Sequence, residues 1–361
     1  MFLKFCATNF GTDCASSTIM KHSIHDSTHT LVTAQHILSL PMPRSRVLSA
    51  AQAQCRHYTS ISTPKAVATL HDAALFTFQR DAFEPATPAL LPRGTFIEMP
   101  AVKKWFLKDA KNNLTLNTTY LAKWGSTIVP LEISNDNDFT RIEQSFSFFL
   151  ECVKASSSHF KPHHNRYFSS YVPGARAVRR TSKSNHFFTS ASNTTTTPTA
   201  HVYLAQAPLA GLPRAFVNDV PTPEIVLKAG RGDVYDSSIW LGRAPTYTPL
   251  HRDPNPNLFV QLAGQKVVRL FNPSVGHGIF AKVQELIGGS ASATMRGEEM
   301  MAGQEKKALE AEVWHETTSH HDDCFEIYLR AGDALFIPKG WWHSIKGRGN
   351  DMTGSVNWWF R

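Results

Sequence analysis

Residues 248–273 read TPLHRDPNPNLFVQLAGQKVVRLFNP and set polar side chains among apolar, β-like runs. His251 and Asp253 stand two residues apart, and Lys266 lies inside the apolar run that follows Gly264. On a strand, residues i and i+2 point to the same face, about 6.6 Å apart along the chain. The His-x-Asp pair can therefore converge on one ion, and we interpret it as part of a metal site.

A third ligand is expected from a later strand. His343 in GDALFIPKGWWHSIKG (332–347) is our candidate, because turns and an apolar strand precede it. Alone, a histidine beside two tryptophans is more often a packed core residue. Together with His251 and Asp253 it completes the two-His-one-carboxylate set of non-haem Fe(II) oxygenases. His-x-Asp also occurs twice in HETTSHHDDC (315–324), where the lack of strand alternation predicts a polar turn.

Short β-like runs separated by turn residues dominate the chain from residue 201 onward. This pattern predicts a mainly β sandwich or barrel of the jelly-roll type. The runs are HVYLAQ, SSIWLG, TYTPLHR, NLFVQL, KVVRLF, EIYL, ALFIP, WWHSIK and SVNWWF. A charged, helical insertion over roughly 280–323 interrupts them.

Upstream, STIVPLEIS (126–134) predicts a β-branched strand, and Pro-punctuated residues 83–106 predict extended segments. Residues 109–124 are weakly helical. The clearest predicted helix is capped by Asn137 or Asp138. Its single apolar stripe comprises Ile142, Phe146, Phe149, Leu150 and Val153.

The composition is that of a globular protein, with 42% hydrophobic residues and a net charge of +8. The basic excess lies in residues 1–64 and in residues 155–200, which hold six cations and no acid. A near-neutral body weakens a nucleic-acid function inferred from charge alone. Five scattered cysteines fit a reducing compartment, and no apolar run is long enough to predict a transmembrane helix.

Residues 1–64 resemble a mitochondrial leader, rich in Ser, Thr and Ala with spaced arginines, and predict the mitochondrial matrix as the location. A disordered N-terminus in a cytoplasmic or nuclear protein is the alternative, and Met42 is a candidate second start. The folded body is expected from about Leu70 to residue 361. Residues 155–200 are a low-complexity insertion that could contact RNA, although a solvated loop is the more ordinary interpretation.

The segments 251–273, 332–347 and 355–360 together resemble the JmjC/cupin-like family of Fe(II)- and 2-oxoglutarate-dependent oxygenases. The resemblance is strongest to its asparaginyl-hydroxylase-like branch and to fungal proteins with a JmjC domain. It covers about residues 200–361 well and extends weakly toward residue 80. It implies a double-stranded β-helix with flanking N-terminal helices, and Fe(II), 2-oxoglutarate and O2 as metal, cosubstrate and oxidant.

The resemblance also assigns cosubstrate residues. Lys266 corresponds to the family lysine that pairs with the far carboxylate of 2-oxoglutarate, and Thr248 and Tyr203 to hydroxyls beside that carboxylate. Asn257 and Asn357 correspond to asparagines near the metal and the pocket. Gln265 and Arg269 keep open the alternative that Lys266 faces solvent, since strand faces alternate.

The implied function is a dioxygenase that hydroxylates a protein side chain, or a modified RNA base reached through the basic residues of 155–200. Protein demethylation and a catalytically silent cupin-like scaffold are the alternatives. Relatives in the family often pair through terminal helices, so a homodimer is a candidate oligomeric state.

Overall fold

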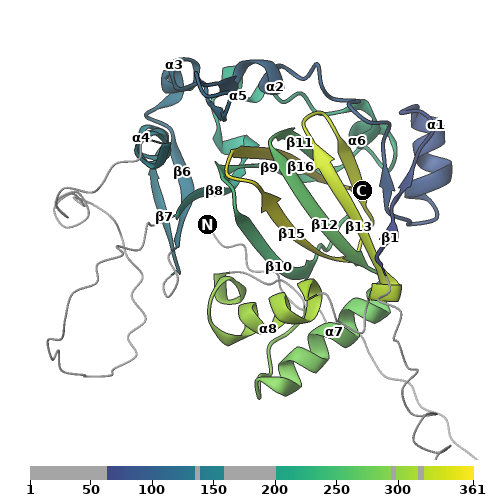
Figure 1. Ribbon diagram of the computed structural model, residues 1–361. Coiled ribbons are helices and arrows are strands. Elements are labelled where there is room, and N and C mark those ends of the chain that lie inside the picture. Colours follow the sequence, from purple (N-terminus) through teal and green to yellow (C-terminus); the bar gives the residue numbers. More distant parts are fainter. Residues whose placement is uncertain (1–62, 135–138, 158–200, 294–297, 316–320) are drawn as a thin grey trace, which may run out of the picture. The chain divides into compact units, whose positions relative to one another are not determined.

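Two β-sheets that pack face to face form the centre of the structure, a computed structural model (Figure 1). It describes residues 63–134, 139–157, 201–293, 298–315 and 321–361. Almost all of the predicted leader and most of the 155–200 insertion lie outside these residues. The described part of the chain belongs to one compact unit, Thr59–Arg361.

The smaller sheet carries five strands and ends at β10 on one side. In spatial order they are β1 (Lys65–Ala66), β13 (Cys324–Arg330), β12 (Gln265–Phe271), β15 (Trp342–Arg348) and β10 (Thr246–Arg252). β1 lies upstream of Leu70, so ordered structure begins before the start expected from the sequence. Among the described residues, β10 has β15 as its one strand partner and forms the edge of this sheet.

The larger sheet carries nine strands and ends at β7. In spatial order they are β2 (Ala68–Thr69), β3 (Ala89–Leu90), β14 (Ala334–Ile337), β11 (Asn257–Ala263), β16 (Met352–Phe360), β9 (Val234–Arg243), β8 (His201–Pro208), β6 (Ile128–Ser134) and β7 (Phe139–Ser145). A separate hairpin pairs β4 (Phe106–Lys108) with β5 (Leu114–Leu116). All nine runs expected after residue 201 are strands, so the mainly β jelly-roll prediction is confirmed.

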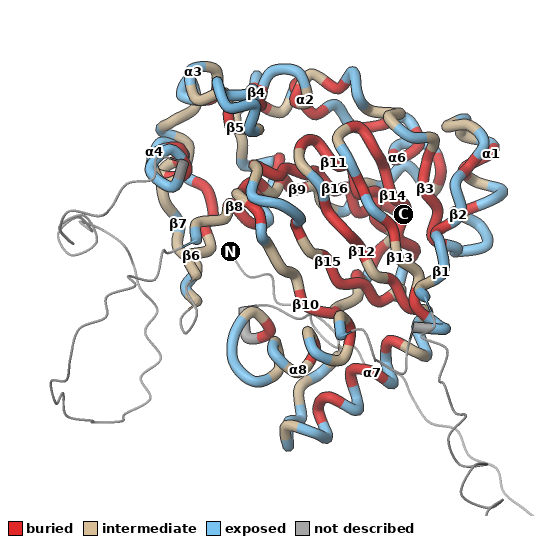
Figure 2. Tube along the Cα trace, viewed as in Figure 1, coloured by how far each residue is buried: buried red, intermediate tan, exposed pale blue. Residues whose placement is uncertain are grey.

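Alternation along the strands divides the apolar side chains among three cores. Phe259, Val268 and Ile345 belong to the core between the two sheets. On β11, Leu258 and Val260 point the other way and pack with the N-terminal segments. On the small sheet, Trp342 points away from the large sheet. It belongs to a third core, which it shares with side chains of the helices at 273–286 and 303–314. Figure 2 shows this burial concentrated on the central strands.

Helices flank both sheets and account for the N-terminal and insertion segments. They are α1 (Leu75–Phe78), α2 (Pro100–Lys104), α3 (Thr118–Leu121), α4 (Phe146–Ser157), α5 (Arg214–Val217), α6 (Glu224–Lys228), α7 (Pro273–Leu286) and α8 (Gly303–Trp314). The helical insertion therefore begins at Pro273 rather than near 280. Within the described residues, no helix has the length and apolar character needed to cross a membrane.

The predicted helix with Ile142 in its stripe is wrong in its first half. Phe139–Ser145 is strand β7, which pairs antiparallel with β6 and places Ile142 opposite Leu131. The helix begins only at Phe146, and the proposed caps Asn137 and Asp138 lie outside the described residues. The stripe crosses a strand-to-helix junction: Ile142 falls on it by coincidence, and cross-strand pairing decides the conformation of its segment.

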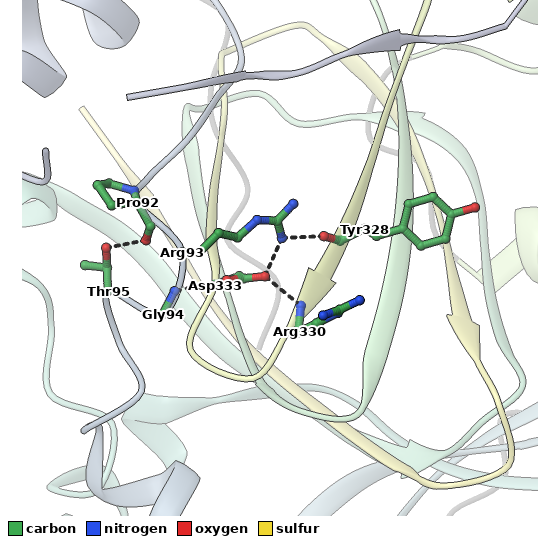
Figure 3. A network of polar contacts seen from close by, with 7 residues as sticks. All are labelled: Pro92, Arg93, Gly94, Thr95, Tyr328, Arg330 and Asp333. Atoms are coloured by element: carbon green, nitrogen blue, oxygen red, sulfur yellow. Dashed lines mark hydrogen bonds and ion pairs between the residues drawn. The ribbon is translucent and has the colours of Figure 1, made fainter. Parts of the chain in front are cut away.

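Asp333 joins the N-terminal segment to the turn between β13 and β14 (Figure 3). Its buried carboxylate accepts hydrogen bonds from Arg93 Nη1 at 2.5 Å, the Gly94 amide at 3.1 Å and the Arg330 amide at 2.9 Å. Arg93 also donates to the carbonyl oxygen of Tyr328 at 2.6 Å. A buried carboxylate is tolerated when its oxygens are satisfied in this way, and here it fixes the strand that leads into the His343 segment.

Gly276 on α7 gives a first test of the packing. A Cβ at Gly276 would lie 2.2 Å from Trp342 Cγ, whereas a Cβ at Gly278 on the same helix meets nothing within 4 Å. We expect Gly276→Ala to lower the free energy of unfolding by about 1–3 kcal/mol through overpacking. Gly278→Ala, the matched control, should be neutral or stabilising by up to about 1 kcal/mol. Denaturant unfolding measures both, and equal effects would contradict the close approach.

Candidate metal centre

His251 and His343 are direct cross-strand partners on β10 and β15. Their ring centroids lie 4.2 Å apart, and His343 Nε2 lies 3.7 Å from Asp253 Oδ2. Candidate ligand atoms of these three residues all lie within 4.8 Å of one another. The structure thus brings together the three side chains that the sequence placed on one site, from segments 90 residues apart.

A bulge on β10 sets the direction of His251. Thr248 pairs with Ile345 and His251 pairs with His343, so three steps on β10 match two steps on β15. The extra residue rotates the strand. Ile345 and His343, two apart on β15, share one face, and the bulge brings Thr248 and His251 onto that same face. Without it, an odd spacing would point the two side chains to opposite faces.

Hydrogen bonds to backbone carbonyls select the ring nitrogen left for a metal. His251 Nδ1 donates to the carbonyl oxygen of Pro249 at 2.9 Å, and His343 Nδ1 donates to that of Trp341 at 3.3 Å. A carbonyl oxygen only accepts, so Nδ1 carries the proton and Nε2 keeps its lone pair. The pKa of His343 is lowered to about 4, mainly by burial and next by the neighbouring His251. Asp253 acts in the opposite direction and raises this pKa. His343 is therefore neutral at neutral pH, the form that binds metals.

Two asparagines orient the carboxylate. Asn257 Nδ2 donates to Asp253 Oδ2 at 2.9 Å, and Asn357 Nδ2 donates to Asn257 Oδ1 at 3.0 Å. Both side chains are buried, and such supports commonly set ligand orientation in metal sites. This chain of bonds leaves Asn357 Oδ1 buried without a protein partner. Its cross-strand neighbour Ser238, which the sequence analysis missed, also has a buried hydroxyl without a protein partner.

Lys266 points into the interior rather than to solvent. It is 3% exposed, and its Nζ lies 2.8 Å from Ser355 Oγ and 3.4 Å from Tyr203 Oη. Burial lowers its pKa to about 7. Among the described residues no carboxylate pairs with this ammonium. The solvent-facing alternative is wrong: on the opposite face of β12, Arg269 pairs with Glu326 at 2.7 Å.

A glycine makes room for the tyrosine beside Lys266. A Cβ at Gly242 would lie 2.2 Å from Tyr203 Cδ2, so the ring packs directly over the glycine backbone. Burial raises the pKa of Tyr203 far above its usual range, which keeps the phenol protonated. Ser355, missed in the sequence, could have been found from strand alternation, since it stands two residues before Asn357 on β16.

A cleft of about 1180 Å³ opens onto this site. Thr248, His251, Asp253 and Tyr203 line it, so the cleft reaches two of the three candidate ligands and the tyrosine beside Lys266. The second His-x-Asp match is separate: His321–Asp323 forms a short 3-10 turn before β13, and His320 lies outside the described residues.

The tryptophans beside the site belong to the cores and to the cleft wall. Trp342 and Trp358 are fully buried, each on the face of its sheet that points away from the other sheet. Trp359 lines the cleft. The aromatic pairs at 341–342 and 358–359 therefore each divide between two faces of a strand.

The donor set fits iron and a dicarboxylate cosubstrate. Two neutral imidazoles and one carboxylate are the ligands that non-haem Fe(II) accepts. A buried ammonium bonded only to hydroxyl groups lacks the anion that would stabilise its charge. Both features are properties of the side chains themselves.

Removal of the Asn257 amide gives a test of the carboxylate support. Asn257→Ala should weaken metal binding by about 10- to 100-fold, because Asp253 loses its orienting donor. Anaerobic titration with Fe(II) or Co(II) measures the affinity. Asn218→Ala, an exposed position at the end of α5, is the control and should leave it unchanged. Equal affinity in Asn257→Ala and the native chain would contradict the role of Asn257.

Comparison with known proteins agrees with this geometry. The family model described as "Cupin-like domain" matches residues 76–361. The chain is 26% identical over 301 residues to Lysine-specific demethylase JMJ30 of Arabidopsis thaliana, covering 82% of this chain and 55% of that protein. It is 30% identical over 171 residues to Lysine-specific demethylase JMJ31 of the same plant, covering 44% and 28%.

Jumonji C domain-containing protein 5 of Drosophila melanogaster is 27% identical over 159 residues, covering 44% of this chain and 36% of that protein. The chain thus spans about half or less of the length of these relatives. The family match covers most of the chain, including every residue of the candidate metal centre and all strands of both sheets except β1 and β2. The chain belongs to the cupin-like domain family, among relatives that carry JmjC domains.

Proposed function

We propose that the chain is an Fe(II)- and 2-oxoglutarate-dependent dioxygenase that hydroxylates a protein side chain. The observation that carries the proposal is the pairing of two features on one face of the small sheet, beside the cleft that His251, Asp253 and Tyr203 line. His251, Asp253 and His343 offer an iron ligand set. Lys266 offers a buried ammonium without a carboxylate partner among the described residues.

In this proposal each side chain has a physical task. His251, Asp253 and His343 would hold iron from one side, and the remaining coordination positions would serve cosubstrate and O2. Lys266, with the hydroxyls of Ser355 and Tyr203, would hold the far carboxylate of 2-oxoglutarate. Bound iron and 2-oxoglutarate supply the oxidising chemistry, and the protein supplies orientation and a dry pocket.

Three further residues complete the pocket in this proposal. Asn257 keeps the Asp253 carboxylate in its binding orientation, and Thr248 lines the cleft on the same face as His251. Asn357 Oδ1 and Ser238 Oγ, which are buried and have no hydrogen-bond partner among the described residues, would bond to groups of a bound ligand or to water.

Demethylation is the alternative chemistry that the names of the relatives suggest. Hydroxylation of an N-methyl group followed by loss of formaldehyde would use the same iron site. The two chemistries differ in product mass, since hydroxylation adds one oxygen atom and demethylation removes a CH2 unit. A silent scaffold is disfavoured, because a scaffold does not need two imidazoles beside an oriented carboxylate.

The deciding experiment is anaerobic addition of Fe(II) and 2-oxoglutarate, followed by air. We expect a visible charge-transfer band and then release of succinate. His251→Ala and Asp253→Ala should lose both signals, because each removes an iron ligand. Asn218→Ala serves as the control again. Native chain that binds neither iron nor 2-oxoglutarate would refute the proposal, as would full succinate release by either ligand variant.

Lys266→Met tests the cosubstrate pocket separately. Loss of the ammonium should lower the affinity for 2-oxoglutarate by at least about tenfold. The affinity for the metal should stay within about threefold of the native value. Because the pKa of Lys266 is about 7, the native affinity should fall as pH rises from 7 to 9 and the amine becomes neutral. The variant should lack this slope. Calorimetric titration measures both, with exposed Gln265→Met as the neighbouring control; equal affinity and slope would remove Lys266 from this role.

A further inference from the structure

The cleft above the metal centre is predominantly cationic. Apart from Asp253, its described lining holds six Arg and Lys side chains against three carboxylates. The cations are Arg141, Arg243, Arg252, Lys306, Lys346 and Arg348, and the acids are Glu132, Asp236 and Glu310. They come from both sheets and from α8. The charge therefore belongs to the cleft as a whole and not to one segment.

Several of these charges have partners within the protein. Lys346 pairs with Glu310 at 2.6 Å, which neutralises one cation and one acid. Arg243 donates to the carbonyl oxygen of Asn350 at 2.8 Å, and Arg252 donates to that of Ala293 at 3.4 Å. Carbonyl partners fix a guanidinium without cancelling its charge.

Three cations line the opening and form no ion pair with a described residue, although Arg141 lies opposite Glu132 on β6 and Lys306 lies one helical turn before Glu310 on α8. Arg141 lies on β7, Lys306 on α8 and Arg348 at the end of β15. Lys306 Nζ lies 5.9 Å from the ring centroid of Tyr247, and Arg348 lies 5.9 Å from that of Tyr328. Their charge is available to a ligand in the cleft.

The size and course of the cleft suit an extended chain. Its volume of about 1180 Å³ exceeds the usual range for sites of small ligands. Consecutive residues Pro245, Thr246, Tyr247 and Thr248 all line it, although successive strand residues point to opposite faces. The cleft therefore follows the open edge of β10 down to His251.

We propose that the substrate of this site is an extended acidic segment of a protein, a proposal that rests on the proposed dioxygenase function. Asp- and Glu-bearing peptides complement Arg141, Lys306 and Arg348, whereas a lysine-rich tail would meet like charge. Electrostatic complementarity of this kind selects partners and increases association rates. The three carboxylates in the lining favour a peptide over RNA, whose phosphate at every nucleotide would be repelled along the same path.

The test measures binding directly on the full chain, loaded with Fe(II) under nitrogen. Three labelled peptides of equal length carry five glutamates, five lysines or five glutamines, and a short oligouridylate serves as the nucleic-acid probe. Fluorescence anisotropy should show the glutamate peptide binding at least about tenfold more tightly than the lysine peptide at low salt. Added salt should reduce this preference.

Charge reversal locates the effect. Arg141→Glu with Lys306→Glu should weaken the glutamate peptide by at least about tenfold, and the two Gln substitutions should give an intermediate loss in a chain whose melting temperature is unchanged. Lys108→Glu, an exposed reversal on β4 outside the cleft lining, is the matched control and should change binding by less than about twofold.

The proposal is overturned if the lysine peptide binds as tightly as the glutamate peptide, if oligouridylate binds more tightly than both, or if Lys108→Glu has the effect of the double reversal. Anisotropy requires no turnover. Preference for the glutamate peptide in a chain that never releases succinate would refute the dioxygenase function and leave the charge selectivity standing.

Discussion

The structure depends on the register between β10 and β15. Pairing of His251 with His343 is one rung of an antiparallel ladder, and the bulge between Thr248 and His251 brings both of these β10 side chains onto the face that carries His343. Since a shift of one residue would reverse every side chain on β10, metal ligands, cleft lining and outer core all rely on the same pairing. Trp342 in the outer core fixes the strand from behind while His343 faces the site.

The site is built as two ends of one interior face. At one end, buried asparagines hold a carboxylate beside two imidazoles. At the other, Lys266 lies among hydroxyl groups and above an aromatic ring, 5.1 Å from the Phe259 centroid. The first end is suited to a metal cation and the second to a carboxylate. A ligand that bridges the metal and the lysine requires both. Gly242 and Gly347 let the side chains of Tyr203 and Thr246 pack directly on the strand backbone.

The sheets and the metal ligands could be predicted from the sequence, because strands have recognisable local sequence patterns. The short β-like runs NLFVQL, KVVRLF and SVNWWF between turn residues predicted the sheets, and the His-x-Asp spacing predicted the ligands. Segment 139–145 was assigned to a helix because its pairing with β6 is a tertiary contact that periodicity does not report. Ser238 and Ser355 were missed for a related reason. Whether a serine on a strand belongs to the site depends on its cross-strand neighbours, which the local sequence does not report. The side to which Lys266 points could not be predicted, because it depends on which alternate residues of the strand face the interior. The nearby polar residue Arg269 left both possibilities open.

The buried ammonium of Lys266 also links ligand supply to persistence of the fold. An amine with a depressed pKa costs folding free energy at neutral pH, because the unfolded chain is protonated without penalty. Any dicarboxylate that pairs with it stabilises the native state in proportion to its concentration above the dissociation constant. The lifetime of this chain against proteases would then follow the cell's supply of such an acid, so the same residue would couple metabolic state to protein abundance.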